Sequence, residues 1–226
     1  MEKLIYVLID TQDQTGGLYD RFDSQLIPEI RRAGGENITL LLSDMTAIQQ
    51  TENPARLIGD FSKISAVVEF WLPSVDLRMD IEARLSSLAG TCWGYLVSES
   101  TIAACPHQVA DGEKVPGVTQ FCINDKPKNV TLDDFYREWA VHSTISFGLH
   151  PERVSYIRNA VFRPLVHGSP DYLGIVYERF PSIELFVNDE LYFGDPVVVQ
   201  EMFDHLPTFF EGETAISGGM SEYRWA

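Results

Sequence analysis

The sequence contains the same order of predicted strands and helices twice, and this repeat constrains the fold more than any other feature. Strands are predicted from short runs rich in β-branched and aromatic residues, and helices from apolar residues spaced along one helical face. The first half predicts strands at 3–9, 36–44, 64–72 and 92–100, with helices at 18–34 and 74–90. The second half predicts strands at 118–124, 153–162, 173–180 and 215–226, a helix at 132–147, and one or two shorter helices between 181 and 206. Shifted by about 115 residues, the halves match in order, βαββαβ, although few residues are identical.

This order predicts an α+β fold made of two ferredoxin-like units. Residues 101–116 are rich in proline and polar residues and predict a linker between a first half at 1–100 and a second at 117–226. A polar connector is predicted over about 45–60. In each unit two helices would cover one face of a four-stranded antiparallel sheet. The other face is also apolar, so we expect the two sheets to pack together as a closed or nearly closed barrel within one chain.

Composition and charge exclude several classes of partner. Apolar residues make up 45% of the 226 residues, which is enough for a core, yet no apolar run reaches the length of a membrane span. The start, MEKLIYVLID, is typical of a strand and lacks the cationic region of a signal peptide, so a cytoplasmic protein is expected. The 33 acidic and 17 basic side chains give a formal charge of −16, which repels nucleic acid and anionic membranes. A small molecule is therefore the expected partner, and pairing into a homodimer stays open.

Metal and disulfide chemistry are not indicated by the sequence. The three cysteines, Cys92, Cys105 and Cys122, form no CxxC pair, and their odd number predicts free thiols. The histidines lack the HxxxH and HExxH spacings of zinc sites. We therefore expect no metal site and no nucleophile of the GxSxG type.

The helix predicted over 132–147 carries a titratable ring on its apolar stripe. Thr131 and Asp134 resemble a capping box at its start. The stripe consists of Leu132, Phe135, Trp139, His142 and Ser146. This spacing points His142 toward the sheet, either as a general acid or base or as a core histidine bonded to a carbonyl. All five histidines follow residue 100, and Ile27 falls near the equivalent place in the first half, so any chemistry is expected in the second half.

The strand that follows this helix offers further polar candidates. Tyr156 and Arg158 share one face of the strand, while Ile157 and Asn159 share the other. A buried Arg158 needs polar partners, which a ligand or an ion pair with Glu178 or Glu184 would supply.

Aromatic residues elsewhere in the second half are candidates for the same pocket. Phe121, Trp139 and Tyr177 are expected either to line a pocket for an aromatic compound or to pack in the core. His167 lies in a Gly/Pro loop that could overhang the pocket, whereas His150, beside Pro151, is expected to end the helix.

The segment from Pro127 to Asn159 resembles the signature of the EthD-like family, within the dimeric α+β barrel superfamily. The matching pattern, an aromatic helix stripe with histidine and a strand with an aromatic and Arg or Asn, consists of Phe135, Trp139, His142, Tyr156, Arg158 and Asn159. The later strand, DYLGIVYERF, is also similar to the family. The resemblance covers about 117–226, whereas the first half matches in element order only, which implies a tandem version. His142-Ser143-Thr144 stands where the family often has HAP, a departure that weakens the transfer of exact roles.

The resemblance implies a range of activities, since related barrels include cyclases, isomerases, monooxygenases, dehydratases and haem-binding proteins. We expect a cofactor-free lyase, isomerase or cyclase acting on a small aromatic or polyketide-like compound. His142 would transfer a proton, with Tyr156 and Arg158 as polar catalytic groups. The predicted substrate contacts are Trp139, Phe121, Asn159, Tyr177 and His167. Haem stays open because relatives bind it through a histidine, and the alternatives are a non-catalytic binding protein for a hydrophobic metabolite or an assembly module with a closed pocket.

Overall fold

The computed structural model describes residues 1–9, 17–44 and 56–226, and within them eight strands form one sheet. The strands are β1 (Glu2–Ile9), β2 (Glu36–Leu42), β3 (Ile64–Leu72), β4 (Thr91–Ala103), β5 (Lys114–Asn124), β6 (Ser155–Pro164), β7 (Gly174–Phe180) and β8 (Ile216–Trp225). Each overlaps a predicted strand, including the one expected at the start of the chain. The predicted connector at 45–60 lies mostly outside the described residues.

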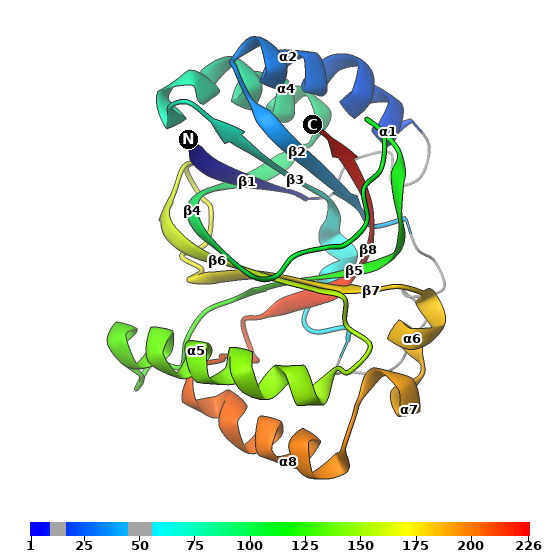
Figure 1. The fold of residues 1–226 in the computed structure, drawn as a ribbon. Helices are drawn as coiled ribbons and strands as arrows, with labels where there is room; N and C mark the ends of the chain where they lie inside the picture. The colour runs from blue at the N-terminus through cyan, green and yellow to red at the C-terminus, as the bar shows by residue number, and fades with distance from the viewer. Residues whose placement is uncertain (10–16, 45–55) are drawn as a thin grey trace.

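The sheet closes into a barrel in which all neighbouring strands are antiparallel (Figure 1). The order around the barrel is β1-β3-β2-β8-β5-β7-β6-β4. The first four strands form the run β4-β1-β3-β2 and the last four form the run β6-β7-β5-β8. The pairings of β2 with β8 and of β4 with β6 join the two runs. The expected α+β fold with a closed barrel is therefore confirmed, and closure leaves the ladder without open edges.

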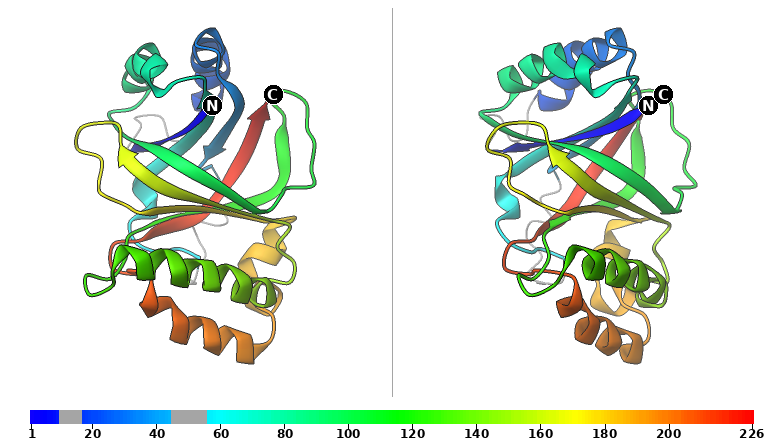
Figure 2. Two further views of the ribbon diagram at one scale, coloured as in Figure 1. Left: turned by 60° about the vertical axis from the view of Figure 1, so that its left-hand side comes forward. Right: turned by 90° about the vertical axis from the view of Figure 1, so that its left-hand side faces the viewer.

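Helices cover the barrel on two opposite sides (Figures 1 and 2). On one side lie α1 (Leu18–Arg21), α2 (Ile27–Arg32) and α4 (Met79–Leu88), and on the other lie α5 (Leu132–Leu149) and α8 (Pro196–His205), with the short α6 (Ile183–Val187) and α7 (Asp189–Tyr192) beside them. Within the described ranges, no helix has both the length and the apolar character needed to cross a bilayer.

The helix predicted over 18–34, with a kink expected at Pro28, is divided in the structure. A π-helical segment, Phe22–Leu26, separates α1 from α2. Pro28 lies in the first turn of α2, has no N–H to donate to the carbonyl four residues earlier, and would clash with it in a regular helix. The wider turn just before Pro28 accommodates this conflict.

Inward-facing side chains fill much of the barrel. Its apolar interior consists of Ile5, Val7, Ile9, Leu41, Phe61, Ile64, Val67, Tyr95, Val97, Phe121, Ile123, Val161, Tyr172, Ile175, Tyr177 and Met220. The glycine pair in β8 is expected to form a bulge, but Gly218 pairs regularly with Phe121, and the irregular register lies in β5 between Val115 and Thr119. A Cβ atom at Gly218 would lie 2.4 Å from the Phe61 ring, so close ring packing explains this glycine.

Two phenylalanines give a matched test of the barrel interior. Phe121 is 0% exposed inside the barrel, whereas Phe162 on β6 is 76% exposed. We expect Phe121→Ala to lower the free energy of unfolding by about 3–5 kcal/mol, because it leaves a cavity in a packed core. Phe162→Ala should change it by less than about 0.5 kcal/mol, since nothing buried is lost. Urea unfolding followed by circular dichroism measures both, and equal effects would contradict the inward placement of Phe121.

Candidate functional site

The sequence around α5 explains how the helix presents its buried face. The Thr131 hydroxyl accepts a hydrogen bond from the backbone N–H of Asp134 at 3.1 Å, which caps the helix start as predicted. Leu132 is half exposed and does not join the buried stripe. The residues of α5 that are buried against the sheet and α8 are Phe135, Trp139, His142, Ser143, Ser146 and Leu149.

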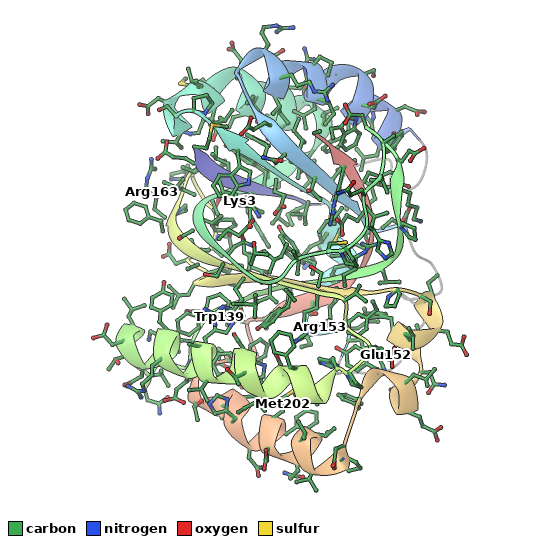
Figure 3. The ribbon with its side chains drawn as sticks, in the orientation of Figure 1. Lys3, Trp139, Glu152, Arg153, Arg163 and Met202 are labelled. Carbon is green, nitrogen blue, oxygen red and sulfur yellow. The ribbon has the colours of Figure 1, made fainter. Side chains whose placement is uncertain are left out.

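Beneath α5 lies a hollow of about 380 Å³, bounded by α8 and by the outward side of β5, β6 and β7. Figure 3 shows Trp139 between α5 and the barrel, and Met202 between α5 and α8. The hollow is lined by Ile58, Cys122, Asn124, Trp139, His142, Leu149, His150, Tyr156, Val176, Glu178, Tyr192, Phe193, Met202, Phe203, Leu206, Phe209 and Phe210. Such a lining, mostly apolar and aromatic with a few polar groups, is typical of small-molecule sites.

His142 is buried at this hollow with an unused ring nitrogen. Its ring lies parallel to that of His205, with centroids 5.9 Å apart, and 4.8 Å from the ring of Phe209. Nδ1 has no hydrogen-bond partner in the described part of the chain, so the alternative of a core histidine bonded to a carbonyl through this atom does not apply. Burial lowers the pKa of His142 to about 4, with smaller contributions from neighbouring groups. At neutral pH the ring is therefore uncharged and able to accept a proton.

Glu178 on β7 is the acidic group of the hollow, and its partner is not the predicted Arg158. The Arg153 guanidinium lies 3.1 Å from the Glu178 carboxylate, and His150 Nε2 lies 3.8 Å from it. Burial acts to raise the pKa of Glu178, but the charge of Arg153 is the main influence that holds it below its usual value. His150 ends α5 as expected and also lines the hollow, where its Nδ1 lies 2.9 Å from the Tyr192 carbonyl. The hollow thus holds a carboxylate beside neutral imidazoles.

Arg158 connects the sheet to α5 and does not line the hollow. Its Nη1 donates to the Trp139 carbonyl at 2.8 Å and to the Ser143 hydroxyl at 2.6 Å. Its guanidinium also stacks 4.7 Å from the centre of the Trp139 ring. Tyr156 does line the hollow, and burial raises the pKa of its hydroxyl to about 12, so it keeps its proton.

The remaining predicted residues lie elsewhere in the molecule. Phe121, Asn159 and Tyr177 face the barrel interior, on the opposite side of the sheet from His142. Phe121 and Tyr177 pack with ring centroids 6.2 Å apart, and the Asn159 amide donates to the Ile175 carbonyl at 3.3 Å. His167 is exposed in the loop between β6 and β7 and is not among the residues that line the hollow. The structure therefore brings together Trp139, His142 and Tyr156 at the hollow.

Several residues that line the hollow or contact His142 are absent from the sequence prediction. His205 stacks on His142 and lies 3.0 Å from the Glu138 carboxylate. The chain from Met202 to Phe209 supplies another wall, and its apolar residues Met202, Leu206 and Phe209 are spaced by four and three, a helical signal that the sequence does contain. No sequence signal reveals that this stripe faces His142.

The residues that line the hollow can also be compared with those that a metal ion or haem would need. Among residues 1–9, 17–44 and 56–226, no group of three or more His, Cys, Asp or Glu side chains is placed to hold a metal ion. An axial histidine for haem iron would be neutral, which His142 is. However, none of the described residues that line the hollow is Arg or Lys, the usual partners of anionic groups such as haem propionates. The lining fits an uncharged aromatic compound better than haem.

Comparison with known proteins identifies the fold. No family model and no curated protein matches the sequence. Among solved structures, an anthrone oxidase-like protein has a TM-score of 0.60 at 10% identity and covers 99% of this chain and 93% of its own. A candidate monooxygenase from Fusobacterium nucleatum has a TM-score of 0.54 at 10% identity, with coverage of 100% and 92%. A chlorite dismutase variant from Candidatus Nitrospira defluvii has a TM-score of 0.51 at 12% identity, with coverage of 97% and 90%. At these identities the comparison shows that the chain shares their fold.

The buried neutral state of His142 should make stability depend on pH. Its folded pKa of about 4 lies below the unfolded value of 6.5, so the unfolded chain binds more protons between these values. Stability contributed by His142 is therefore present above pH 6.5 and is lost as the pH falls toward 4, by about 2 kcal/mol between pH 7 and pH 5. We expect His142→Gln, which cannot titrate, to lose less stability over this interval than the unchanged protein. Urea midpoints at the two pH values measure this, and identical losses would contradict the burial of an uncharged ring.

Proposed function

We propose that the hollow beneath α5 binds a small, largely uncharged aromatic compound and that the chain is an enzyme that moves a proton of this compound without a cofactor. Lyase, isomerase and cyclase reactions belong to this type. The observation that carries the proposal is the neutral, unpaired Nδ1 of His142 inside a hollow lined mainly by apolar and aromatic side chains. A base in such a place acts on a bound compound with little competition from solvent.

The surrounding side chains suit a proton transfer to His142. Proton transfer would leave a positive imidazolium, and the nearby Glu178 carboxylate favours that form. The Tyr156 hydroxyl, which keeps its proton at neutral pH, can donate to an oxygen on which negative charge develops. The rings of Trp139 and Phe209 line the hollow and can pack against an aromatic compound, while the Arg158 guanidinium lies over the Trp139 ring and bonds to the Trp139 carbonyl. Together these groups supply a base, a carboxylate that stabilises the protonated base, and a hydroxyl that donates a hydrogen bond to an oxygen of the bound compound.

The comparisons and the sequence resemblance support the class of compound. The solved structures with this fold include proteins named as an anthrone oxidase-like protein and a candidate monooxygenase. The EthD-like resemblance of 117–226 points to the same chemistry of small aromatic or polyketide-like compounds. We further propose that the chain is a tandem pair of ferredoxin-like units, 1–100 and 117–226, joined by 101–116. The matching strand order of the two runs supports this duplication.

The second candidate is a protein that binds a hydrophobic compound without turning it over. A pKa of about 4 makes His142 a weak base, and this favours binding without chemistry unless the bound compound raises that pKa. The two candidates differ in whether hydrogen at an acidic carbon of the ligand exchanges with solvent.

Anthrone, with an acidic methylene group, is a suitable probe of this chemistry. Under nitrogen in deuterated buffer, we expect the protein to accelerate deuterium uptake at that carbon, measured by NMR. His142→Gln should slow the exchange by about 10²–10⁴-fold, the usual effect of losing a general base. The rate should be level from neutral pH down to about 5 and fall near pH 4, as His142 becomes protonated.

His167→Gln is the matched control, because His167 is exposed and is not among the residues that line the hollow. It should exchange at the unchanged rate. Saturable binding of anthrone with exchange no faster than in buffer would contradict the enzyme and favour the binding protein. Oxygen uptake, measured separately in air, reports whether the deprotonated compound is also oxidised.

A further inference from the structure

The barrel encloses a second hollow of about 820 Å³, on the opposite side of the sheet from His142. Whereas much of the barrel interior is apolar, this end is charged, and the charged side chains come from five different strands. They are Lys3, Glu69, Glu99, Arg179, Glu222 and Arg224. Figure 3 shows Lys3 within the barrel, where it is 1% exposed. The exposed residues Thr101, Ala104 and Gln108 also line the hollow, so it reaches the surface.

The charges form two clusters of opposite sign. The negative cluster contains Lys3, whose ammonium lies 2.8 Å from the Glu69 carboxylate and 2.5 Å from that of Glu99. Two carboxylates share one ammonium, so the cluster is net negative. Burial acts to lower the pKa of Lys3, but the two carboxylates outweigh it and raise this pKa.

The positive cluster has the reverse composition. Arg179 lies 2.7 Å and Arg224 lies 2.5 Å from the single Glu222 carboxylate, so two guanidinium groups share one acid. Arg179 also donates to the Thr119 hydroxyl at 2.6 Å and to the Pro116 carbonyl. Its Nε is buried and has no hydrogen-bond partner in the described part of the chain, so this guanidinium has donor capacity to spare.

The clusters face a common space at a defined separation. In the sheet, Thr39 of β2 lies opposite Glu69 of β3 on one side and opposite Arg224 of β8 on the other. The Cα atoms of Glu69 and Arg224 are therefore about 10 Å apart, two strand spacings. Tyr177 lies between the clusters: its ring centre is 5.7 Å from the Lys3 ammonium, and carboxylates of both clusters act on its hydroxyl. The apolar side chains of Leu41 and Ile157 line the same hollow.

A net charge of either sign is costly on side chains as buried as Lys3, Arg179 and Glu222 unless a counter-charge is present. A ligand with a cationic end and an anionic end would neutralise both clusters at once. The volume is within the range of small-molecule sites. We propose that this end of the barrel is a second ligand site, separate from the hollow beneath α5, for a small zwitterion of the ω-amino acid type. Its ammonium lies at Glu69 and Glu99, its carboxylate at Arg179 and Arg224, and its methylene chain against Leu41 and Ile157.

The test is calorimetric titration of the full chain at low salt with 6-aminohexanoate. Hexanoate and hexylamine are the matched ligands, because each keeps the chain and only one of the two charges. We expect saturable binding of 6-aminohexanoate, at least tenfold tighter than that of either matched ligand. Binding that saturates equally well with hexanoate or hexylamine, or no saturable heat at millimolar 6-aminohexanoate, would overturn the proposal.

Variants locate the site without dismantling the most buried ion pairs. The side chains of Glu99 and Arg224 are 20% and 30% exposed, the most accessible members of their clusters. Glu99→Gln and Arg224→Gln should each weaken 6-aminohexanoate at least tenfold, while circular dichroism confirms that both variants stay folded. His142→Gln should bind it with unchanged affinity, which separates this site from the one beneath α5. Unchanged affinity in both folded cluster variants would mean that the ligand binds elsewhere, and the proposal would be wrong.

Discussion

The structure depends on two seams of strand pairing, β2 with β8 and β4 with β6. Each half of the chain provides four strands whose two faces are both apolar, so one layer of helices leaves one face uncovered. Closing the two runs into one barrel buries that face and satisfies the backbone groups at the sheet edges. Closure also places the two helical layers on opposite outer sides of the barrel. Both hollows follow from this arrangement, one inside the barrel and one beneath a helical layer.

The two helical layers differ in how they meet the barrel. Under α2 and α4 the contact is an apolar core, in which Ile27 and Ile30 pack directly on the strands. Under α5 lies the imidazole of His142, whose place in the second half corresponds to that of Ile27 in the first. Beside it are Trp139 and the ion pair of Glu178 with Arg153. Large rings and paired charges cannot interdigitate as closely as aliphatic side chains, and α8 adds an outer wall. A hollow therefore remains beneath α5, whereas the space beneath α2 and α4 is filled by packed side chains.

The charged side chains inside the barrel are divided into two clusters of opposite net charge. The chain is strongly acidic overall, yet the buried clusters inside the barrel are balanced when taken together. Each buried carboxylate there has a cationic neighbour, because an isolated charge would not tolerate burial. The separation of the surplus charges onto two sides is a property of the closed barrel, since the clusters draw on strands far apart in the sequence.

Much of the fold could be predicted because strand and helix patterns are local. The eight strands and the capped helix α5 follow from alternation, from apolar spacing and from Thr131, all of which act over a few residues. The kink in the first helical region could be expected from Pro28, but its π-helical form could not, because a proline signals a disturbance without specifying its geometry. The glycine pair of β8 was expected to form a bulge, but at Gly218 the close packing of the Phe61 ring, distant in sequence, explains the glycine.

The candidate site could be predicted only in part. The sequence by itself determined that His142 and Trp139 share the buried face of α5, and that Tyr156 and Asn159 lie on opposite faces of one strand. It does not determine which face of each strand turns toward α5, and only the structure places Phe121 and Tyr177 in the core of the barrel, one of the two alternatives left open for them. Only the tertiary structure decided that Arg153 pairs with Glu178, that His205 stacks on His142, and that charges from five strands meet inside the barrel. Alternation along a strand is a local property, whereas the neighbours on each face depend on how distant strands pair when the barrel closes.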